Sequence, residues 1–135
     1  MSASSNKDSV IDLFNLKNQG SAAGGTVGRM NLKTLPSLDR QKMAVTLILL
    51  EPCGINLPHT HPRAAEGLYV VSGDKVLLGV IEENGSKVIL NNLHKGEATF
   101  VPQCAIHFEQ NLQCEPAVLI AANNNEDPGT LTIES

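Results

Sequence analysis

Short apolar runs alternate with turn-forming residues along most of this chain. Seven runs have the length of a β-strand and are rich in β-branched residues: 44–50, 67–73, 75–81, 87–90, 98–101, 106–110 and 117–122. Glycine, proline, asparagine or aspartate bounds each run, and Asn84-Gly85 between two of them is a strong hairpin signal. No long stretch with helical periodicity interrupts the series. The pattern therefore predicts an all-β sandwich or barrel.

The first 25 residues differ in composition from the rest of the chain. They are polar and end in the flexible sequence G-S-A-A-G-G, and within them only residues 9–16 could form one short amphipathic helix. We expect residues 1–25 to be an arm that packs on the body or on a neighbouring subunit. Residues 26–135 should then form a single domain, which suits a chain of this length.

Composition and charge exclude several classes of partner. The net charge of −4 and the pI near 5.5 provide no basic field for nucleic acid or anionic lipid. No apolar run approaches the roughly 20 residues that span a bilayer, so we expect no membrane insertion. The first residues lack the layout of a signal peptide, which predicts a cytoplasmic protein for the chain as written. A secreted mature form that has lost its leader is the alternative.

Histidine is scarce, yet two of the four histidines, His59 and His61, lie one residue apart. Alternate side chains of a strand face the same way, so both imidazoles can reach one metal ion, and Glu66 could add a carboxylate oxygen. Of the remaining two, His94 is in a polar turn typical of a surface. His107 is on a strand with apolar neighbours, where it is either a hydrogen-bonded core residue or a ligand.

The spacing around these residues resembles the cupin superfamily, and specifically its germin and spherulin-like branch. The first motif of that branch reads here G-INLP-H-T-H-PRAA-E-GLYVVS-G over residues 54–73, with a first spacer one residue shorter than the commonest form. The second reads G-EATFV-P-Q-C-AI-H-FEQ-N over 96–111, with Cys104 in place of a glycine. The segments P-H-T-H-P-R-A and N-N-N-E-D-P-G look like the fungal and slime-mould spherulin type.

The resemblance implies a small cupin jelly-roll barrel with one metal ion inside it. By matching position, the ligands would be His59, His61, Glu66 and His107, and Mn²⁺ is the usual ion of germins. Three imidazoles and one carboxylate leave about two of six octahedral positions open, which suits Mn²⁺ or Fe²⁺. Affinity alone would favour Cu²⁺ or Zn²⁺, and Ni²⁺ is a further alternative.

The function implied by this resemblance is that of a metal-dependent oxidoreductase acting on a small oxygen-rich substrate, O₂ or superoxide. Isomerase, decarboxylase or dioxygenase chemistry in secondary metabolism is one alternative. A storage or stress protein with a structural ion is another, and a cupin that binds no metal is a third. The resemblance also implies a homodimer or larger homo-oligomer, in which the arm is a candidate interface element.

Two residues beside the expected ligands are candidates for the chemistry. Asn56 has the place of one substrate-binding asparagine of oxalate-oxidising germins, but Thr46 stands where the second is found. Threonine cannot reproduce the reach and the donor pair of an amide, which argues against oxalate oxidase activity. Glu109 shares the strand face of His107, and it is either a proton carrier or a solvated strand end.

The three cysteines are too few for a disulfide framework. If the glycine that Cys104 replaces has a positive φ, cysteine there costs on the order of 1 kcal/mol or more, or the loop is rearranged. We expect an inert buried thiol, and a thiol near the mouth of the barrel is the alternative. In a jelly roll the strands beside Cys53 and Cys114 pair antiparallel, so a disulfide between these two and a pair of free thiols are both open. A disulfide would suit a secreted protein.

Overall fold

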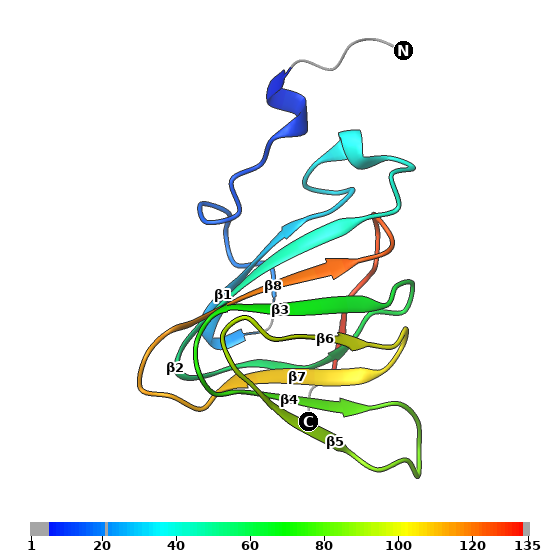
Figure 1. The fold of residues 1–135 in the computed structure, drawn as a ribbon. Helices are drawn as coiled ribbons and strands as arrows, with labels where there is room; N and C mark the ends of the chain where they lie inside the picture. The colour runs from blue at the N-terminus through cyan, green and yellow to red at the C-terminus, as the bar shows by residue number, and fades with distance from the viewer. Residues whose placement is uncertain (1–5, 21, 134–135) are drawn as a thin grey trace.

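The computed structural model describes residues 6–20 and 22–133, and the regular secondary structure of these residues is almost entirely β (Figure 1). Two short 3-10 helices, η1 (Asn6–Ser9) and η2 (Pro36–Leu38), occur in the described part of the chain. Its nine strands are β1 (Ala22–Met30), β2 (Ala44–Thr60), β3 (Glu66–Ser72), β4 (Val76–Ile81), β5 (Ile89–Leu93), β6 (Ala98–Val101), β7 (Ile106–Asn111), β8 (Ala117–Asn123) and β9 (Leu131–Thr132). None of the helical segments in these ranges is long and apolar enough to cross a membrane.

All strand pairs are antiparallel, and together they make a nearly closed barrel, as the strand pattern and the resemblance predicted. The strands lie in the order β5-β4-β7-β2-β8-β3-β6, and β1 and β9 also pair with β2. The 17-residue strand β2 belongs to both walls of the barrel. Residues 44–50 of β2 pair with β8, whereas His59 and the residues just before it pair with β7. This long strand therefore carries the His-x-His segment from one wall to the other.

All seven predicted strands are present, and a further strand that was not predicted begins before Thr26. The strand β1 begins at Ala22 and pairs with β2 over most of its length. Its sequence A-A-G-G-T-V-G-R-M carries little apolar alternation, so the pattern gave no strand signal there. The division into an arm and a domain at residue 25 stays a prediction, and β1 crosses that boundary.

The short amphipathic helix predicted over residues 9–16 does not form. These residues are irregular or in turns, and the helical turn of this region is η1. The carboxylate of Asp12 accepts a hydrogen bond from the backbone N–H of Phe14 at 3.0 Å, which stabilises a local turn in place of a helix. Gln19 N donates to Val27 O at 2.8 Å, so the end of this segment packs on the barrel.

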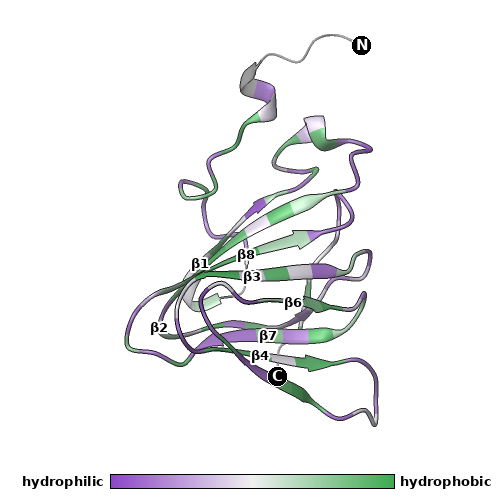
Figure 2. Cartoon of the chain, viewed as in Figure 1, coloured by the Kyte–Doolittle hydropathy of each residue, from purple (hydrophilic) through white to green (hydrophobic). Residues whose placement is uncertain are grey.

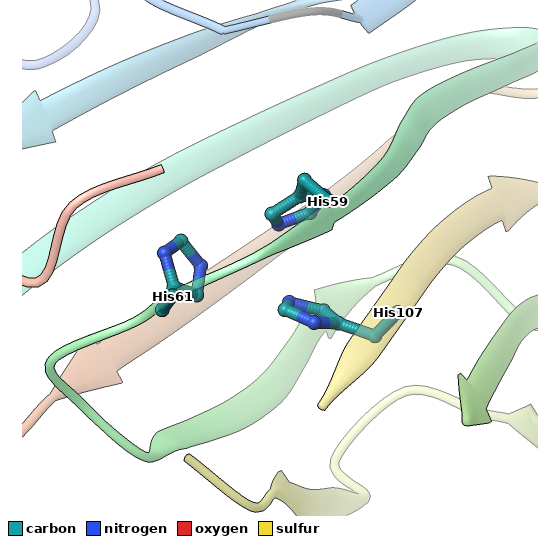
Figure 3. A group of neighbouring side chains, drawn as sticks. All are labelled: His59, His61 and His107. Atoms are coloured by element: carbon teal, nitrogen blue, oxygen red, sulfur yellow. The ribbon is translucent and has the colours of Figure 1, made fainter. Parts of the chain in front are cut away.

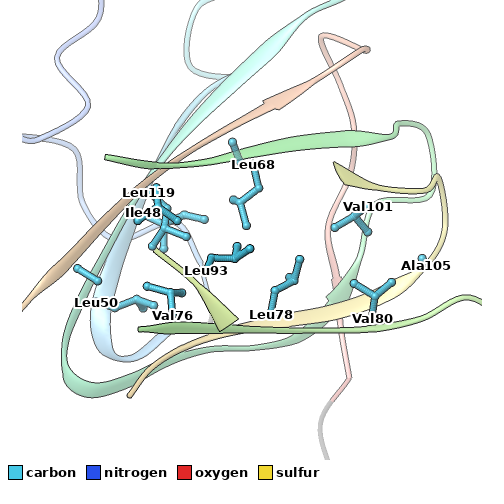
Figure 4. Close-up of a cluster of buried hydrophobic side chains, with 13 residues drawn as sticks. Ile48, Leu50, Leu68, Val76, Leu78, Val80, Leu93, Val101, Ala105 and Leu119 are labelled. Carbon is cyan, nitrogen blue, oxygen red and sulfur yellow. The ribbon is translucent and has the colours of Figure 1, made fainter. Parts of the chain in front are cut away.

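The barrel is filled from the inward faces of its strands. Hydropathy colouring shows apolar residues along most strands and polar residues in the turns, whereas β7 is largely polar (Figure 2). Thirteen buried residues form one cluster (Figure 4): Ile48, Leu50, Leu68, Val70, Val76, Leu78, Val80, Leu93, Val101, Ala105, Ala117, Leu119 and Ala121. Burial of these aliphatic side chains is the main stabilising contribution to the fold.

Candidate metal centre

The inward face of β7 is polar, in contrast to the apolar faces around it. Its buried side chains are His107, Glu109 and Asn111, each at most 1% exposed. Buried polar groups are costly unless they are hydrogen-bonded. Asn111 meets this condition, because its Nδ2 donates to three backbone carbonyls, Leu50 O at 3.2 Å, Glu51 O at 3.1 Å and Glu115 O at 2.6 Å. His107 and Glu109 do not meet it fully, because His107 Nε2 and Glu109 Oε1 lack a hydrogen-bond partner, which makes the first half of β7 a candidate functional site.

Three imidazoles converge beside this strand face. His59 on β2 is the cross-strand partner of His107 on β7, and His61 follows just after β2 ends. Figure 3 shows the three rings turned toward one another, with centroids 4.1 Å apart for His59–His107, 5.0 Å for His59–His61 and 5.3 Å for His61–His107. All three side chains are buried. One nitrogen from each ring lies within 4.8 Å of the others, so the group could hold a metal ion.

Each of the three rings is oriented by a backbone carbonyl that contacts its Nδ1 atom. The Nδ1 atoms lie at hydrogen-bond distance from carbonyl oxygens: 2.8 Å from Leu57 O for His59, 2.6 Å from Gly129 O for His61 and 3.1 Å from Ala105 O for His107. A carbonyl oxygen only accepts, so each Nδ1 must carry the proton and donate it. Each Nε2 is therefore the atom left to bind an ion, which is the outer-shell arrangement typical of histidine ligands.

Glu66 brings a carboxylate to the imidazoles from the start of β3. Its Oε2 lies 2.9 Å from His61 Nε2 and accepts a hydrogen bond from Asn123 Nδ2 at 3.4 Å. Its Oε1 lies 3.4 Å from His107 Nε2, close enough for an ion pair but without hydrogen-bond alignment. Burial by itself would raise the pKa of Glu66, but the contacts with His107 and His61 outweigh it and hold this pKa well below its usual value. Glu66 is therefore an ionised carboxylate.

This environment shifts the pKa values of His59 and His107 in opposite directions. Burial, assisted by the charge of His107, lowers the pKa of His59 to about 3, so the imidazole of His59 is neutral. Burial would lower the pKa of His107 as well, but Glu66 and Glu109 outweigh it and raise this pKa to about 9. The two carboxylates therefore draw positive charge to His107 Nε2.

Glu109 is fully buried, so the alternative of a solvated strand end is wrong. Its Oε2 accepts a hydrogen bond from Asn56 Nδ2 at 3.0 Å, across the β2–β7 pairing that sets these two residues opposite each other. Its Oε1 has no hydrogen-bond partner and lies 4.0 Å from His107 Nε2. Burial, followed by the charge of Glu66, raises the pKa of Glu109 to about 7.

The residues at this point fit a metal ion. Four buried side-chain atoms in the described part of the chain lack a hydrogen-bond partner, and three of them, Glu66 Oε1, His107 Nε2 and Glu109 Oε1, face one another. Nε2 and carboxylate oxygen are suitable ligand atoms for Mn²⁺, Fe²⁺ and Zn²⁺. A cation bound among them would satisfy all three atoms at once.

The structure brings together all six residues that the sequence suggested for the site: His59, His61, Glu66, His107, Asn56 and Glu109. His94 lies elsewhere on the surface, where it pairs with Glu97 at 2.7 Å. Asn123, whose Nδ2 donates a hydrogen bond to Glu66 Oε2, was not predicted from the sequence. Its signal was present in the N-N-N segment, but nothing local connects that segment to a carboxylate 57 residues away.

The cysteines differ from their prediction. Cys104 has the expected positive φ of 69°, but it is exposed, so the buried thiol is wrong. Its turn after β6 points the side chain outward, with Sγ 3.4 Å from Pro62 O. Cys53 and Cys114 are also exposed and free, so the disulfide alternative does not form.

The sequence of this chain is similar to a family model and to several known proteins. A family model described as cupin matches residues 11–135. Spherulin-1A of Physarum polycephalum is 47% identical over 112 residues, which cover 83% of this chain and 45% of that protein. Probable germin-like protein subfamily 2 member 5 of Arabidopsis thaliana is 34% identical over 121 residues, or 90% of this chain and 56% of that protein. This chain spans about half the length of these relatives.

Solved structures share the fold. A recombinant oxalate oxidase in complex with glycolate matches 97% of this chain and 66% of its own with a TM-score of 0.86, at 24% identity. The S161A mutant of Bacillus subtilis oxalate decarboxylase matches 96% of this chain and 37% of its own with a TM-score of 0.78, at 22% identity. At these identities the likeness shows the barrel architecture alone.

Proposed function

This chain belongs to the cupin family, and we propose that it is a metal-dependent oxidoreductase of the germin type that acts on a small oxygen-rich substrate, O₂ or superoxide. The observation that supports this proposal is the group of buried, unpaired ligand atoms at the polar end of the barrel. Such atoms are costly in a protein interior unless something binds them. A purely structural barrel would have no reason to keep them.

We assign the ion to His59, His61, Glu66 and His107. Mn²⁺ is the proposed ion, and Fe²⁺, Zn²⁺, Ni²⁺ and Cu²⁺ are the alternatives, because imidazole and carboxylate accept all five. The ion, when bound, would supply a Lewis-acid or redox centre with open positions. The protein contributes the neutral imidazole of His59, the fixed Nε2 direction of each ring and the ionised carboxylate of Glu66.

Asn56 and Glu109 are the proposed residues on the substrate side. Glu109 Oε1 is a free carboxylate oxygen close to the ligand atoms, so we assign it the exchange of a proton with a bound substrate. The Asn56 amide donates to the other oxygen of Glu109, and it therefore orients this carboxyl group. Because that N–H is engaged, and because Thr46 replaces the second amide, we propose a substrate other than oxalate.

A metal-stabilised storage or stress protein without turnover is a second candidate. It is favoured by the deep burial of the ligand set and by the similarity to Spherulin-1A and Spherulin-1B. Rapid exchange of bound water or small anions on the loaded protein supports the enzyme, whereas a site closed to both supports the structural role. Isomerase, decarboxylase and dioxygenase activities are further alternatives, tested with the panel of small acids and hydroxy acids that also tests the oxidoreductase.

We further propose that the chain forms a homodimer or larger homo-oligomer. The outward faces of β3 and β6 carry Tyr69, Val71 and Phe100, all exposed apolar side chains on neighbouring strands. A surface of this kind on paired strands is suited to a partner subunit. Sedimentation equilibrium should show an oligomer that Phe100→Asp dissociates, while Leu112→Asp, at another exposed apolar position, leaves it intact.

The test of the metal assignment combines elemental analysis with turnover. Protein purified without added metal should contain one equivalent of a transition metal and should act on superoxide or on a member of a panel of small acids and hydroxy acids. His59→Ala and His107→Ala should lose both the metal and the activity. His94→Ala is the matched control, because it deletes an exposed imidazole that pairs with Glu97 away from the site, and it should retain both. Stoichiometric metal in His107→Ala would contradict the assignment.

A further inference from the structure

The site contains one carboxylate more than the four assigned ligands require. Glu109 lies on the same strand face as His107, two residues further along β7, and is fully buried. One of its oxygens is bound by Asn56, while the other, Oε1, has no partner. A buried, unpaired carboxylate oxygen beside the ligand atoms itself indicates a bound cation.

The separations permit Glu109 to share an ion with its neighbours. Two ligands of one ion can be no further apart than two metal–ligand bonds, which is about 4.2 Å for bonds of about 2.1 Å. His107 Nε2 lies 3.4 Å from Glu66 Oε1 and 4.0 Å from Glu109 Oε1, both inside this limit. Glu66, His107 and Glu109 also form a group whose ligand atoms all lie within 4.8 Å of one another.

The charges at the site favour the same arrangement. A divalent ion held by one carboxylate and three neutral imidazoles leaves one uncompensated positive charge, and this charge would be buried. The second carboxylate balances it. The amide of Asn56 holds Oε2 away from the imidazoles, so that Glu109 presents a single oxygen, Oε1, toward them.

We propose that Glu109 is a fifth protein ligand of the ion, through Oε1, in a set of three imidazoles and two carboxylates. This inference rests on the metal site of the proposed function and specifies its substrate. Five ligands leave about one open position of six, whereas four leave about two. The site then takes a substrate that binds through one atom, such as superoxide, and disfavours small acids that chelate through two oxygens.

A chelating acid has to displace Glu109 before it can bind through both of its oxygens. In that case the displaced carboxylate would lie beside the substrate and could exchange a proton with it, whereas a substrate that binds through one atom leaves Glu109 on the ion. The competing arrangement has Glu109 outside the coordination sphere, accepting a hydrogen bond from a metal-bound water. Metal affinity does not separate the two, because loss of an outer-shell partner also weakens binding by about 10–100-fold. The number of bound waters does separate them.

The test counts exchangeable waters on the full chain loaded with Mn²⁺, by relaxation of water protons and by pulsed electron paramagnetic resonance in deuterated water. One water on the wild-type protein supports the proposal, and two overturn it. This measurement needs no variant, so a folding defect cannot obscure it. Failure of the wild-type protein to bind Mn²⁺ would overturn the proposed function as well, whereas Mn²⁺ bound with two waters would overturn this inference alone.

A variant without the Glu109 carboxylate and a matched control test the same proposal. Glu109→Leu removes both oxygens while keeping a side chain of similar size, and it should gain one exchangeable water. Glycolate, used as the chelating probe, should bind the loaded Glu109→Leu protein at least about tenfold more tightly than wild type, because both of its oxygens can then reach the ion. Glu97→Gln, which changes an exposed carboxylate paired with His94, is the matched control and should behave as wild type. Equal glycolate affinity and equal water counts in all three proteins would overturn the proposal.

Discussion

Replacing Cys104 by glycine should stabilise the protein, although cysteine is the native residue. Cys104 has a φ of 69°, in the left-handed region, where a Cβ costs about 1–2 kcal/mol. Glycine removes that cost, but it also raises the backbone entropy of the unfolded chain, which lowers the stability by about 0.5–1 kcal/mol. The exposed thiol contributes little stability, because it donates a weak hydrogen bond to Pro62 O at 3.4 Å. The net gain in the free energy of unfolding should be about 0.5–1 kcal/mol.

This gain converts into a measurable shift of the melting temperature. An unfolding entropy of about 2.1 cal/mol/K per residue gives about 0.28 kcal/mol/K for 135 residues. The melting temperature of Cys104→Gly should therefore rise by about 2–4 °C. Differential scanning calorimetry of the metal-free protein, with chelator and reductant present, measures this shift without a contribution from the ion or from thiol oxidation.

Two controls isolate the backbone effect from the loss of the thiol. Cys104→Ala keeps a Cβ at the same positive φ, so it should not gain stability. Cys114→Gly removes an exposed cysteine at a position without a positive φ, and its melting temperature should fall. If Cys104→Gly also melts at a lower temperature, or if Cys104→Ala gains as much as glycine does, the strain argument is refuted.

Three further predictions concern the core, the β7 anchor and the ion. Leu119→Ala, in the buried cluster, should lower the free energy of unfolding by about 3–5 kcal/mol in urea titration, whereas exposed Leu90→Ala should change it by less than about 0.5 kcal/mol. Asn111→Ala loses three hydrogen bonds to backbone carbonyls and should cost about 2–4 kcal/mol in the same titration; a cost below that of the Leu90 variant would contradict the role of Asn111 as an anchor. Mn²⁺ at about 100 times its dissociation constant should raise the free energy of unfolding by about 2.7 kcal/mol in wild type and not in His107→Ala, as measured by calorimetry with and without chelator.

The sequence by itself determined the strands and the candidate ligands. Side chains alternate along a strand with a period of two, so apolar alternation and turn residues located seven strands, and the same rule placed His59 and His61 on one face. The same alternation put Glu109 on the face of His107. These are local properties of the chain, readable within a few residues of each position.

Only the tertiary structure decided how these elements meet. The register of β2 against β7 sets His59 opposite His107 and Asn56 opposite Glu109, and no local pattern specifies which residues two distant strands will pair. The strand β1 forms because β2 offers it an edge, despite its glycine-rich sequence. The unpaired atoms of Glu66, His107 and Glu109 can be identified only when the hydrogen bonds of the folded interior are known. Strand periodicity is local, whereas register and the satisfaction of buried polar groups depend on the whole barrel, and this is why the candidate residues are readable from the sequence but the unpaired oxygen of Glu109 is not.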